Sequence, residues 1–191
     1  MSHPHDHLDD HPHDHSHDGV ACEVAHGNAP ADEAGAAESR ALIAVFANPV
    51  ARYLLRYAAD AGYRTVLVEP DPELARAASE SGLEVRTGIG SYPDAATDVV
   101  VTDHHRSELG VMLRDALATP ARWVGIMGSP RHEGPHLQAL ALLGVAPDEI
   151  SRVHRPIGLN IGSKTPPEIA ISTLAGLIAD RNDRRGGFDF D

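Results

Sequence analysis

The sequence predicts an α/β protein with a doubly wound, mostly parallel, Rossmann-like sheet that carries helices on both faces. Two observations support this fold class. Short runs rich in β-branched residues alternate with segments whose apolar residues recur at helical spacing. Gly, Pro and Asp separate these segments along the chain. Strands that alternate with helices in this way form parallel sheets with right-handed crossovers.

The first β-α unit begins with the run ALIAVFA at 41–47, which is apolar throughout, as in a strand buried on both faces. A helix is expected at 49–61, because Pro49 suits its first turn and Gly62 suits its end. The run TVLVE at 65–69 repeats the strand signal and opens a second unit.

The second helix is expected at 73–81, after two prolines that interrupt the strand signal. A weak strand at 84–87 follows, and then a strong strand, DVVVT, at 98–102. A helix at 106–118 completes this part of the pattern. The alternation of strand and helix therefore continues.

The run ARWVGIM at 121–127 predicts a fifth strand, and a helix is expected at 131–143. A short helical turn at 147–152 leads into the loop HRPIGLNIGSKTP, and a helix at 167–179 closes the pattern. The domain is expected to span 40–181. Residues 182–191 are expected to form a flexible tail.

Composition excludes several classes of protein. The chain has 191 residues, with 16 Lys and Arg against 28 Asp and Glu, and a formal net charge of -12. This charge argues against nucleic acid or an anionic membrane as the main partner. One cysteine allows no intrachain disulfide, and no apolar run has the length of a membrane span. We therefore expect an unprocessed cytoplasmic protein.

The first 39 residues differ from the rest of the chain. They contain nine acidic residues, no Lys or Arg, and eight histidines. With few large apolar side chains to bury, this segment is expected to be disordered. Its imidazoles and carboxylates suit divalent metals such as Ni, Zn or Cu, although a solvated polyampholyte or a tag would have the same composition. The predicted metal ligands are His3, His5, His7, His11, His13, His15 and His17.

A dinucleotide site would require glycines after the first strand, where the backbone approaches a pyrophosphate. The sequence there is VFANPVARYLL, which has none of them. Glu69 nevertheless ends the second strand, 21 residues after Asn48, where an acid can accept from a ribose hydroxyl. NAD(P) therefore remains an alternative ligand, and an NAD(P)-dependent oxidoreductase an alternative function. The other reading is that Glu69 and Asp71 cap the next helix.

Two further strand ends carry polar groups. TDHHRSE at 102–108 places adjacent histidines where an imidazole can move a proton, although two such side chains normally point apart. GIMGSPRH at 125–132 gathers Gly128, Ser129 and Arg131 at an expected helix start, which suits a phosphate. The alternative for the second motif is Ser129 as N-cap with Pro130 in the first turn.

The motifs in the last third of the chain resemble the carboxy-terminal Rossmann domain of the XdhC/CoxI family. The family pattern is similar to Gly-x-x-Gly-Ser-x-Arg, then His-x-Pro-Ile-Gly-Leu-x-Ile-Gly, then Thr-Pro-x-Glu-Ile-Ala-x-Ser. Seventeen positions match it: Gly125, Gly128, Ser129, Arg131, His154, Pro156, Ile157, Gly158, Leu159, Ile161, Gly162, Thr165, Pro166, Glu168, Ile169, Ala170 and Ser172. A first turn of Gly-Ala-Gly-His in the family is Ala47-Asn48-Pro49 here.

The resemblance implies a maturation factor for molybdenum hydroxylases of the xanthine or carbon monoxide dehydrogenase type. Such a protein would bind molybdenum cofactor and pass it to the apo-enzyme, together with a sulfur-donating enzyme, as a carrier more than a catalyst. The phosphate of the cofactor would be held at 128–131 and 158–162. A homodimer is compatible with this fold. The predicted cofactor-binding residues are Asn48, Glu69, Gly125, Gly128, Ser129, Arg131, His154, Gly158 and Gly162.

Overall fold

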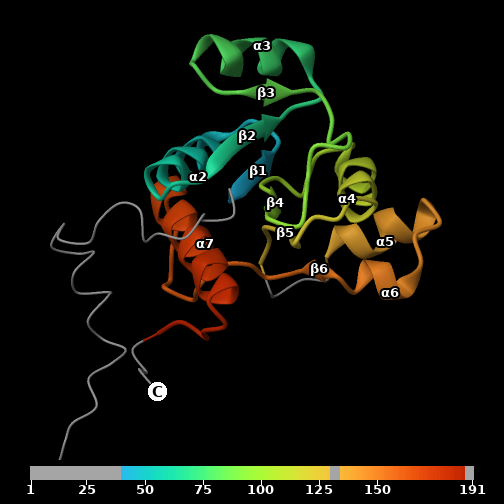
Figure 1. The fold of residues 1–191 in the computed structure, drawn as a ribbon. Coiled ribbons are helices and arrows are strands. Elements are labelled where there is room, and N and C mark those ends of the chain that lie inside the picture. The colour runs from blue at the N-terminus through green and yellow to red at the C-terminus, as the bar shows by residue number, and fades with distance from the viewer. Residues whose placement is uncertain (1–39, 130–133, 188–191) are drawn as a thin grey trace, which may run out of the picture. The chain divides into compact units, whose positions relative to one another are not determined.

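The computed structural model describes residues 40–129 and 134–187. Within them lies a six-stranded, all-parallel sheet with the order β3-β2-β1-β4-β5-β6 (Figure 1). The predicted Rossmann-like fold class is therefore confirmed. The elements in chain order are β1 (Ala41–Val45), α2 (Pro49–Asp60), β2 (Arg64–Val68), α3 (Pro72–Glu80), β3 (Val85–Arg86), β4 (Thr97–Val101), α4 (Leu109–Leu117), β5 (Trp123–Ile126), α5 (Pro135–Leu142), α6 (Pro147–Ile150), β6 (Val153–His154) and α7 (Pro166–Arg181).

The centre of the sheet is β1, which pairs with β2 on one side and with β4 on the other. Ile43 lies opposite Val66 of β2 and Val99 of β4. Every residue of β1 is fully buried. A strand between two neighbours and two layers of helices has no solvent-facing side, which explains why its sequence is apolar rather than alternating.

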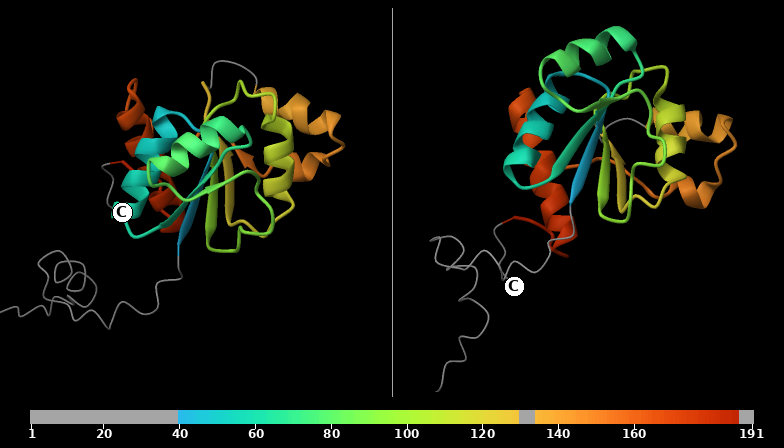
Figure 2. Two further views of the ribbon diagram at one scale, coloured as in Figure 1. Left: turned by 90° about the horizontal axis from the view of Figure 1, so that it is seen from above. Right: turned by 45° about the horizontal axis from the view of Figure 1, so that its top comes forward.

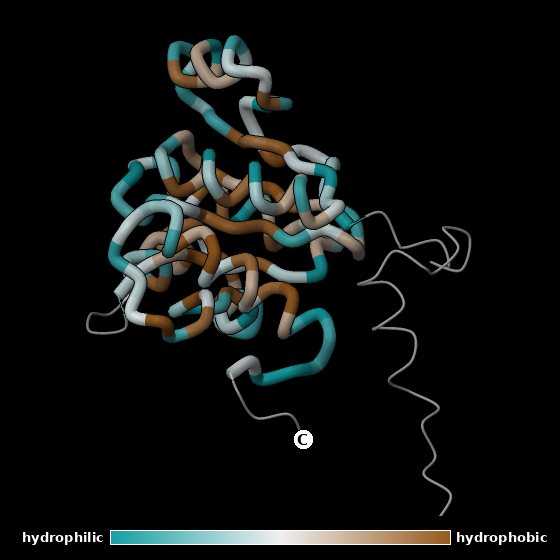
Figure 3. Tube along the Cα trace, turned by 90° about the vertical axis from the view of Figure 1, so that its left-hand side faces the viewer, coloured by the Kyte–Doolittle hydropathy of each residue, from teal (hydrophilic) through white to brown (hydrophobic). Residues whose placement is uncertain are grey.

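Helices cover both faces of the sheet (Figure 2). The alternating residues Leu42 and Ala44 of β1 pack with α2 and α7, whereas Ile43 and Val45 pack with α4. The apolar residues are concentrated in the strands, and the hydrophilic ones lie mainly on the outer turns (Figure 3). The longest helix, α7, has 16 residues, and none of the helices within 40–129 and 134–187 is long and apolar enough to cross a membrane.

The structure differs from the sequence prediction at two places in the last third of the chain. Val153, which had no assignment, and His154, expected as the first residue of the loop, form the edge strand β6 beside β5. A strand of two residues leaves no periodic pattern to detect. The helix expected at 131–143 begins only at Pro135, because Gly134 is extended and acts as its N-cap. Proline suits the first helical turn, since its missing N–H has no partner there.

A buried ion cluster lies at the amino end of β4. The Asp98 side chain is fully buried and accepts from Arg122 Nε at 2.6 Å and from Arg181 Nη2 at 2.9 Å. Arg122 also pairs with Asp180 at 2.6 Å, and Arg181 donates to the carbonyl of Ala96 at 2.9 Å. The cluster ties α7 to the sheet at the edge opposite the carboxyl ends of the strands.

Candidate functional site

The chain leaves the carboxyl ends of β1 and β4 in opposite directions, toward β2 and toward β5. In open α/β sheets, ligands bind outside the strand ends at such a switch point. A cavity of about 590 Å³ lies at this edge, and we call it the switch-point cavity. It lies between the start of α2, the loops after β4, β5 and β6, and α7. Its walls are Val50, Thr102, His104, residues 127–129, residues 156–163, Ile169, Ser172 and Thr173.

Asn48 joins the end of β1 to the end of β4 beside this cavity. Its Oδ1 accepts from the backbone N–H of Ala51 at 2.8 Å and caps α2. Its Nδ2 donates to Thr102 Oγ1 at 2.8 Å, and the Thr102 hydroxyl donates to the carbonyl of Val45 at the same distance. Both ends of the Asn48 amide therefore have partners within the protein. Its predicted contact with a cofactor stays a prediction.

Glu69 is fully buried where β2 ends, and protein groups surround its carboxylate. Oε2 accepts from the backbone N–H of Ala47 at 2.7 Å, and Oε1 accepts from that of Asp71 at 2.9 Å. The guanidinium of Arg106 donates to both oxygens, at 3.3 and 2.9 Å. Asp71 in turn caps α3, as the alternative reading expected. Binding of a ribose by Glu69 stays a prediction, and it would have to displace one of these donors.

Arg106 connects Glu69 to Phe46, in the turn between β1 and α2. Its guanidinium also pairs with Glu108 at 3.2 Å and lies over the ring of Phe46, 4.7 Å from the centroid. The hydrogen bond from Arg106 lowers the pKa of Glu108 to about 2. Phe46 has a φ of 76°, a left-handed conformation that is rare for residues other than glycine. The turn between β1 and α2 thus contains an aromatic ring and lies against an ion pair, at the place where a dinucleotide-binding fold has glycines.

Three of the predicted glycines accommodate side chains of this chain. A Cβ at Gly125 would lie 2.2 Å from the ring of Trp123, and one at Gly128 would lie 2.8 Å from Arg155 Nε. A Cβ at Gly158, whose φ is +85°, would lie 2.6 Å from Ser172 Oγ. Of these glycines, only Gly162, with a φ of +69°, has no atom of the described residues within 4 Å of the added Cβ. Gly128, Gly158 and Gly162 line the switch-point cavity, whereas Gly125 lies inside β5.

The segment after β5 was predicted as a phosphate site at a helix start. Ser129 does line the cavity, and its carbonyl accepts from Arg155 Nη2 at 2.8 Å. The helix, however, begins at Pro135, so Ser129 is not its N-cap. Arg131 lies outside the described residues. The cationic group that the structure does place beside Gly128 and Ser129 is Arg155.

His104 contributes an imidazole to the wall of the switch-point cavity. Burial lowers its pKa, and the neighbouring His105 and Arg155 lower it further. The ring is therefore mainly neutral at pH 7, with one donor and one acceptor nitrogen. The expectation that the adjacent histidines point apart was wrong, because their ring centroids are 4.0 Å apart. The loop after β4 is not extended there, so the alternation of a strand does not apply.

His154 lies outside the switch-point cavity. It stands on β6, where its ring stacks on that of Trp123, with centroids 4.8 Å apart and planes 10° apart. The seven predicted metal-binding histidines at the start of the chain all lie outside the described residues. Within the described part of the chain, no group of three or more His, Cys, Asp or Glu side chains is placed to hold a metal ion.

Because His136, in the first turn of α5, is buried, we expect the free energy of unfolding to depend on pH. His136 is 5% exposed, its Nδ1 has no partner among the described residues, and burial followed by Arg155 lowers its pKa below 6.5. The unfolded chain then binds its proton at a higher pH than the folded chain does. The free energy of unfolding is therefore highest above the pKa that His136 has in the unfolded chain. It falls as the pH decreases toward the pKa that His136 has in the folded chain.

Urea unfolding at about pH 7.5 and about pH 5.5 measures this loss. The loss on acidification is expected to be smaller in His136→Gln than in the unchanged protein, because glutamine takes up no proton. An equal loss in both proteins would show that His136 does not contribute to it.

Two residues of this region had no role in the sequence prediction of the site. Arg155 lies between His154 and Pro156 in the motif, and its contact with Ser129 spans 26 positions of sequence. Thr102 hydrogen-bonds to residues more than 50 positions away. No local pattern indicates such contacts. The two adjacent histidines after β4 were the one signal that pointed to His104.

Comparisons with known proteins agree with this fold. The sequence model of the XdhC Rossmann domain matches residues 42–177. Over 95 residues the chain is 36% identical to the uncharacterized protein YqeB of Escherichia coli (strain K12), a match that covers 50% of this chain and 17% of YqeB. A crystal structure described as a xanthine dehydrogenase from Bacillus halodurans is 25% identical, with a TM-score of 0.61 over 77% of this chain and 46% of that one.

The chain thus matches less than half of the length of each of these two proteins. The family model covers the Rossmann domain, and residues 128–129 and 156–162 within the matched range line the switch-point cavity. The family match covers most of the chain and coincides with the six-stranded domain. By its Rossmann domain, the chain belongs to the XdhC family.

Proposed function

We propose that this protein binds molybdenum cofactor in the switch-point cavity and assists its maturation and its insertion into a molybdenum hydroxylase. The observation that carries the proposal is a cavity walled by the family's own motifs, at the edge of the sheet where Rossmann folds bind ligands. The xanthine dehydrogenase description of the Bacillus halodurans relative points to the same class of client enzyme.

The size and the walls of the cavity fit this cofactor. About 590 Å³ falls in the usual range for small-molecule sites. Gly162 presents backbone without a side chain and has open space beside it, so a flat pterin can approach closely there. Hydroxyls of Ser129 and Ser163 supply hydrogen bonds for a phosphate, and Arg155 behind Ser129 adds positive charge.

The residues of the cavity have different tasks in this proposal. Apolar side chains such as Met127 and Ile169 exclude water from the ring. The neutral imidazole of His104 can donate or accept one hydrogen bond without adding a charge. When bound, molybdenum cofactor supplies the metal centre at which the client enzyme oxidises its substrate. The site offers groups that bind and shield, and we therefore propose a carrier more than a catalyst.

The proposal assigns the protein two partners: a molybdenum hydroxylase apo-enzyme that receives the cofactor and an enzyme that donates sulfur to it. Both follow from the family rather than from a surface of the described residues. A carrier must release its ligand, so its affinity for the cofactor has to be lower than that of the apo-enzyme.

A cavity-filling variant tests the site. Molybdenum cofactor released from a donor enzyme is mixed with the full chain, and bound pterin is measured after gel filtration. We expect Ser163→Phe to retain less than about a tenth of the pterin that the unchanged protein retains, because the ring occupies the cavity. Ser151→Phe is the matched control, since Ser151 is exposed after α6 and outside the cavity.

Equal retention by both variants, with both folded by circular dichroism, would place the cofactor elsewhere. No retention by the unchanged protein would contradict the proposal itself.

A further inference from the structure

A second cavity, of about 240 Å³, lies beside α7 and shares the wall 156–159 with the switch-point cavity. We call it the C-terminal cavity, because the segment after α7 forms one of its sides. Its other walls are the pair Trp123 and His154 and the residues of α7 around Gly176. None of the residues outside this shared wall has a task in the function proposed above.

One side of the C-terminal cavity is aromatic. The indole of Trp123 and the imidazole of His154 are nearly parallel, with centroids 4.8 Å apart. Trp123 is 8% exposed, whereas His154 is exposed. The indole lies along β5 because Gly125 has no side chain. Gly158 and Gly176 meet on the adjoining side, where a Cβ at Gly176 would lie 3.0 Å from the Gly158 Cα. These glycines let the loop after β6 pack closely on α7, and the pair Trp123 and His154 gives the cavity an aromatic side, which suits a flat ligand.

The charges around the cavity are positive. The carboxylate of Asp180 belongs to its wall, but Arg122 neutralises it at 2.6 Å. Arg184 and Arg185 also line the cavity, are exposed, and form no ion pair with any described residue. Two guanidinium groups without a carboxylate partner in the described part of the chain, beside a small cavity, favour an anionic ligand.

The segment that carries these two arginines is held against the domain. The backbone N–H of Arg184 donates to the carbonyl of Ala179 at 2.8 Å, which closes the turn after α7. Gly186, with a φ of +74°, packs so closely on Leu159 that a Cβ there would lie 2.7 Å from the leucine Cδ2. Contacts on both sides of Arg184 and Arg185 thus fix the course of the backbone past the cavity.

We propose that the C-terminal cavity binds a fused heteroaromatic ring that carries an anionic group, of the kind found in purine nucleoside monophosphates and in pterin carboxylates. The ring lies against the Trp123 and His154 pair, and the anion lies against Arg184 and Arg185. A volume of about 240 Å³ leaves room for one two-ring heterocycle and is too small to enclose a dinucleotide. The inference does not rest on the proposed function, because the aromatic pair and the two arginines that carry it do not line the switch-point cavity.

Trp123 is the only tryptophan of the chain, so its fluorescence reports on this cavity alone. The full chain is titrated with guanosine monophosphate, with pterin-6-carboxylate and with inorganic phosphate, and calorimetry measures the affinity in parallel. We expect the two ring compounds to bind and to change the Trp123 emission, and inorganic phosphate to do neither at the same concentrations. A preference between the two ring compounds distinguishes a purine site from a pterin site.

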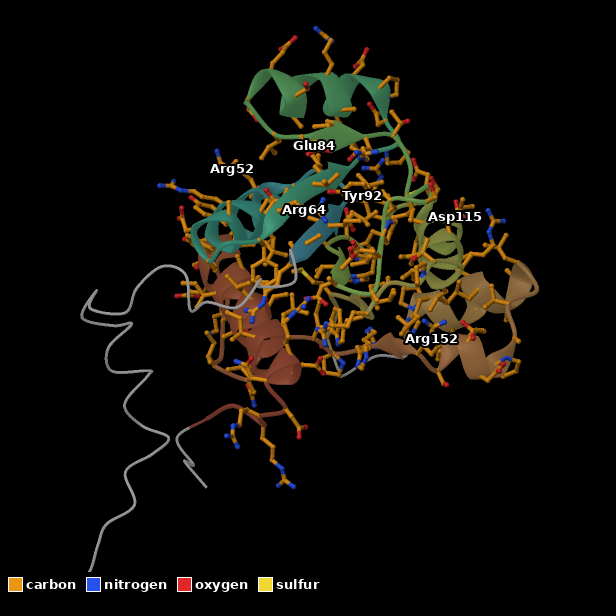
Figure 4. All side chains as sticks on the ribbon, in the orientation of Figure 1. Arg52, Arg64, Glu84, Tyr92, Asp115 and Arg152 are labelled. Atoms are coloured by element: carbon orange, nitrogen blue, oxygen red, sulfur yellow. The ribbon has the colours of Figure 1, made fainter. Side chains whose placement is uncertain are left out.

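The double variant Arg184→Ala with Arg185→Ala is expected to weaken binding of both ring compounds by at least about tenfold, because two charge-assisted contacts are lost. Arg52→Ala with Arg56→Ala is the matched control. Both residues are exposed on α2 and outside the cavity, and Arg52 points outward (Figure 4). This control removes the same charge and should leave the affinity unchanged. His154→Ala should weaken binding of the ring compounds as well.

No binding of either ring compound to the unchanged protein would overturn the inference. An equal loss of affinity in both double variants would overturn the role of Arg184 and Arg185, because it would show that binding depends on net charge alone. Ser163→Phe fills the switch-point cavity and should leave binding in the C-terminal cavity intact, so that failure of one proposal can be told from failure of the other.

Discussion

Replacing Glu69 by alanine is expected to lower the free energy of unfolding by about 3–5 kcal/mol, the usual cost of breaking a buried ion pair. The carboxylate is fully buried and accepts hydrogen bonds from two backbone N–H groups and from the guanidinium of Arg106. Its removal leaves the N–H groups of Ala47 and Asp71 and a largely buried guanidinium without their acceptor. Urea unfolding followed by circular dichroism measures the loss.

A double-mutant cycle separates the ion pair from the other contacts of Glu69. Arg106→Ala leaves the buried carboxylate uncompensated, so the double variant should lose clearly less than the sum of the two single variants. Asp60→Ala is the control, because this exposed carboxylate at the end of α2 should change stability by less than about 0.5 kcal/mol. If Glu69→Ala lowered the free energy of unfolding no more than Asp60→Ala does, the buried Glu69 carboxylate would not stabilise the turn between β1 and α2.

Replacing Asp98 by alanine is expected to lower the free energy of unfolding by a similar amount, about 3–5 kcal/mol. This change breaks the buried ion cluster that joins β4 to α7. Asp98 is fully buried in β4 and joins Arg122 and Arg181, so its loss leaves two partly buried guanidinium groups beside a cavity. Because Arg181 ends α7, the docking of this helix should loosen first. Hydrogen exchange of the α7 amides, together with urea unfolding, measures both effects.

Asp115→Ala provides the comparison for Asp98→Ala. Asp115 pairs with Arg114 at 2.7 Å, but both side chains are about 40% exposed, and Figure 4 shows Asp115 on the outside of α4. Such a pair contributes less than about 1 kcal/mol. A loss in Asp98→Ala no larger than that in Asp115→Ala would mean that the buried cluster does not hold α7 to the sheet.

The sequence predicted the sheet well where strands are buried on both faces. The run around Ile43 is apolar throughout, and the run around Val99 has three consecutive valines, as is typical of parallel strands buried on both faces. The edge strand β6 has two residues and gives no such signal. The sequence predicts the start of α5 too early because Ser129 and Pro130 match a helix start as well as Gly134 and Pro135 do.

The candidate site was predictable only in outline. The motifs at 128–129 and 156–162 do meet at one cavity, as the parallel strands require. The contacts that decide the role of single residues join positions far apart in sequence, such as Glu69 with Arg106 and Gly128 with Arg155. A glycine that makes room for a ligand and one that makes room for a side chain look the same in a sequence.

The most direct test of the proposed function is the content of the protein when it is purified as the full chain from cells that make molybdenum cofactor. Pterin fluorescence after oxidation and molybdenum by mass spectrometry are measured on the same sample, beside Ser163→Phe. The proposal predicts near-stoichiometric pterin with molybdenum in the unchanged protein and little of either in the variant. Absence of both from the unchanged protein would contradict it.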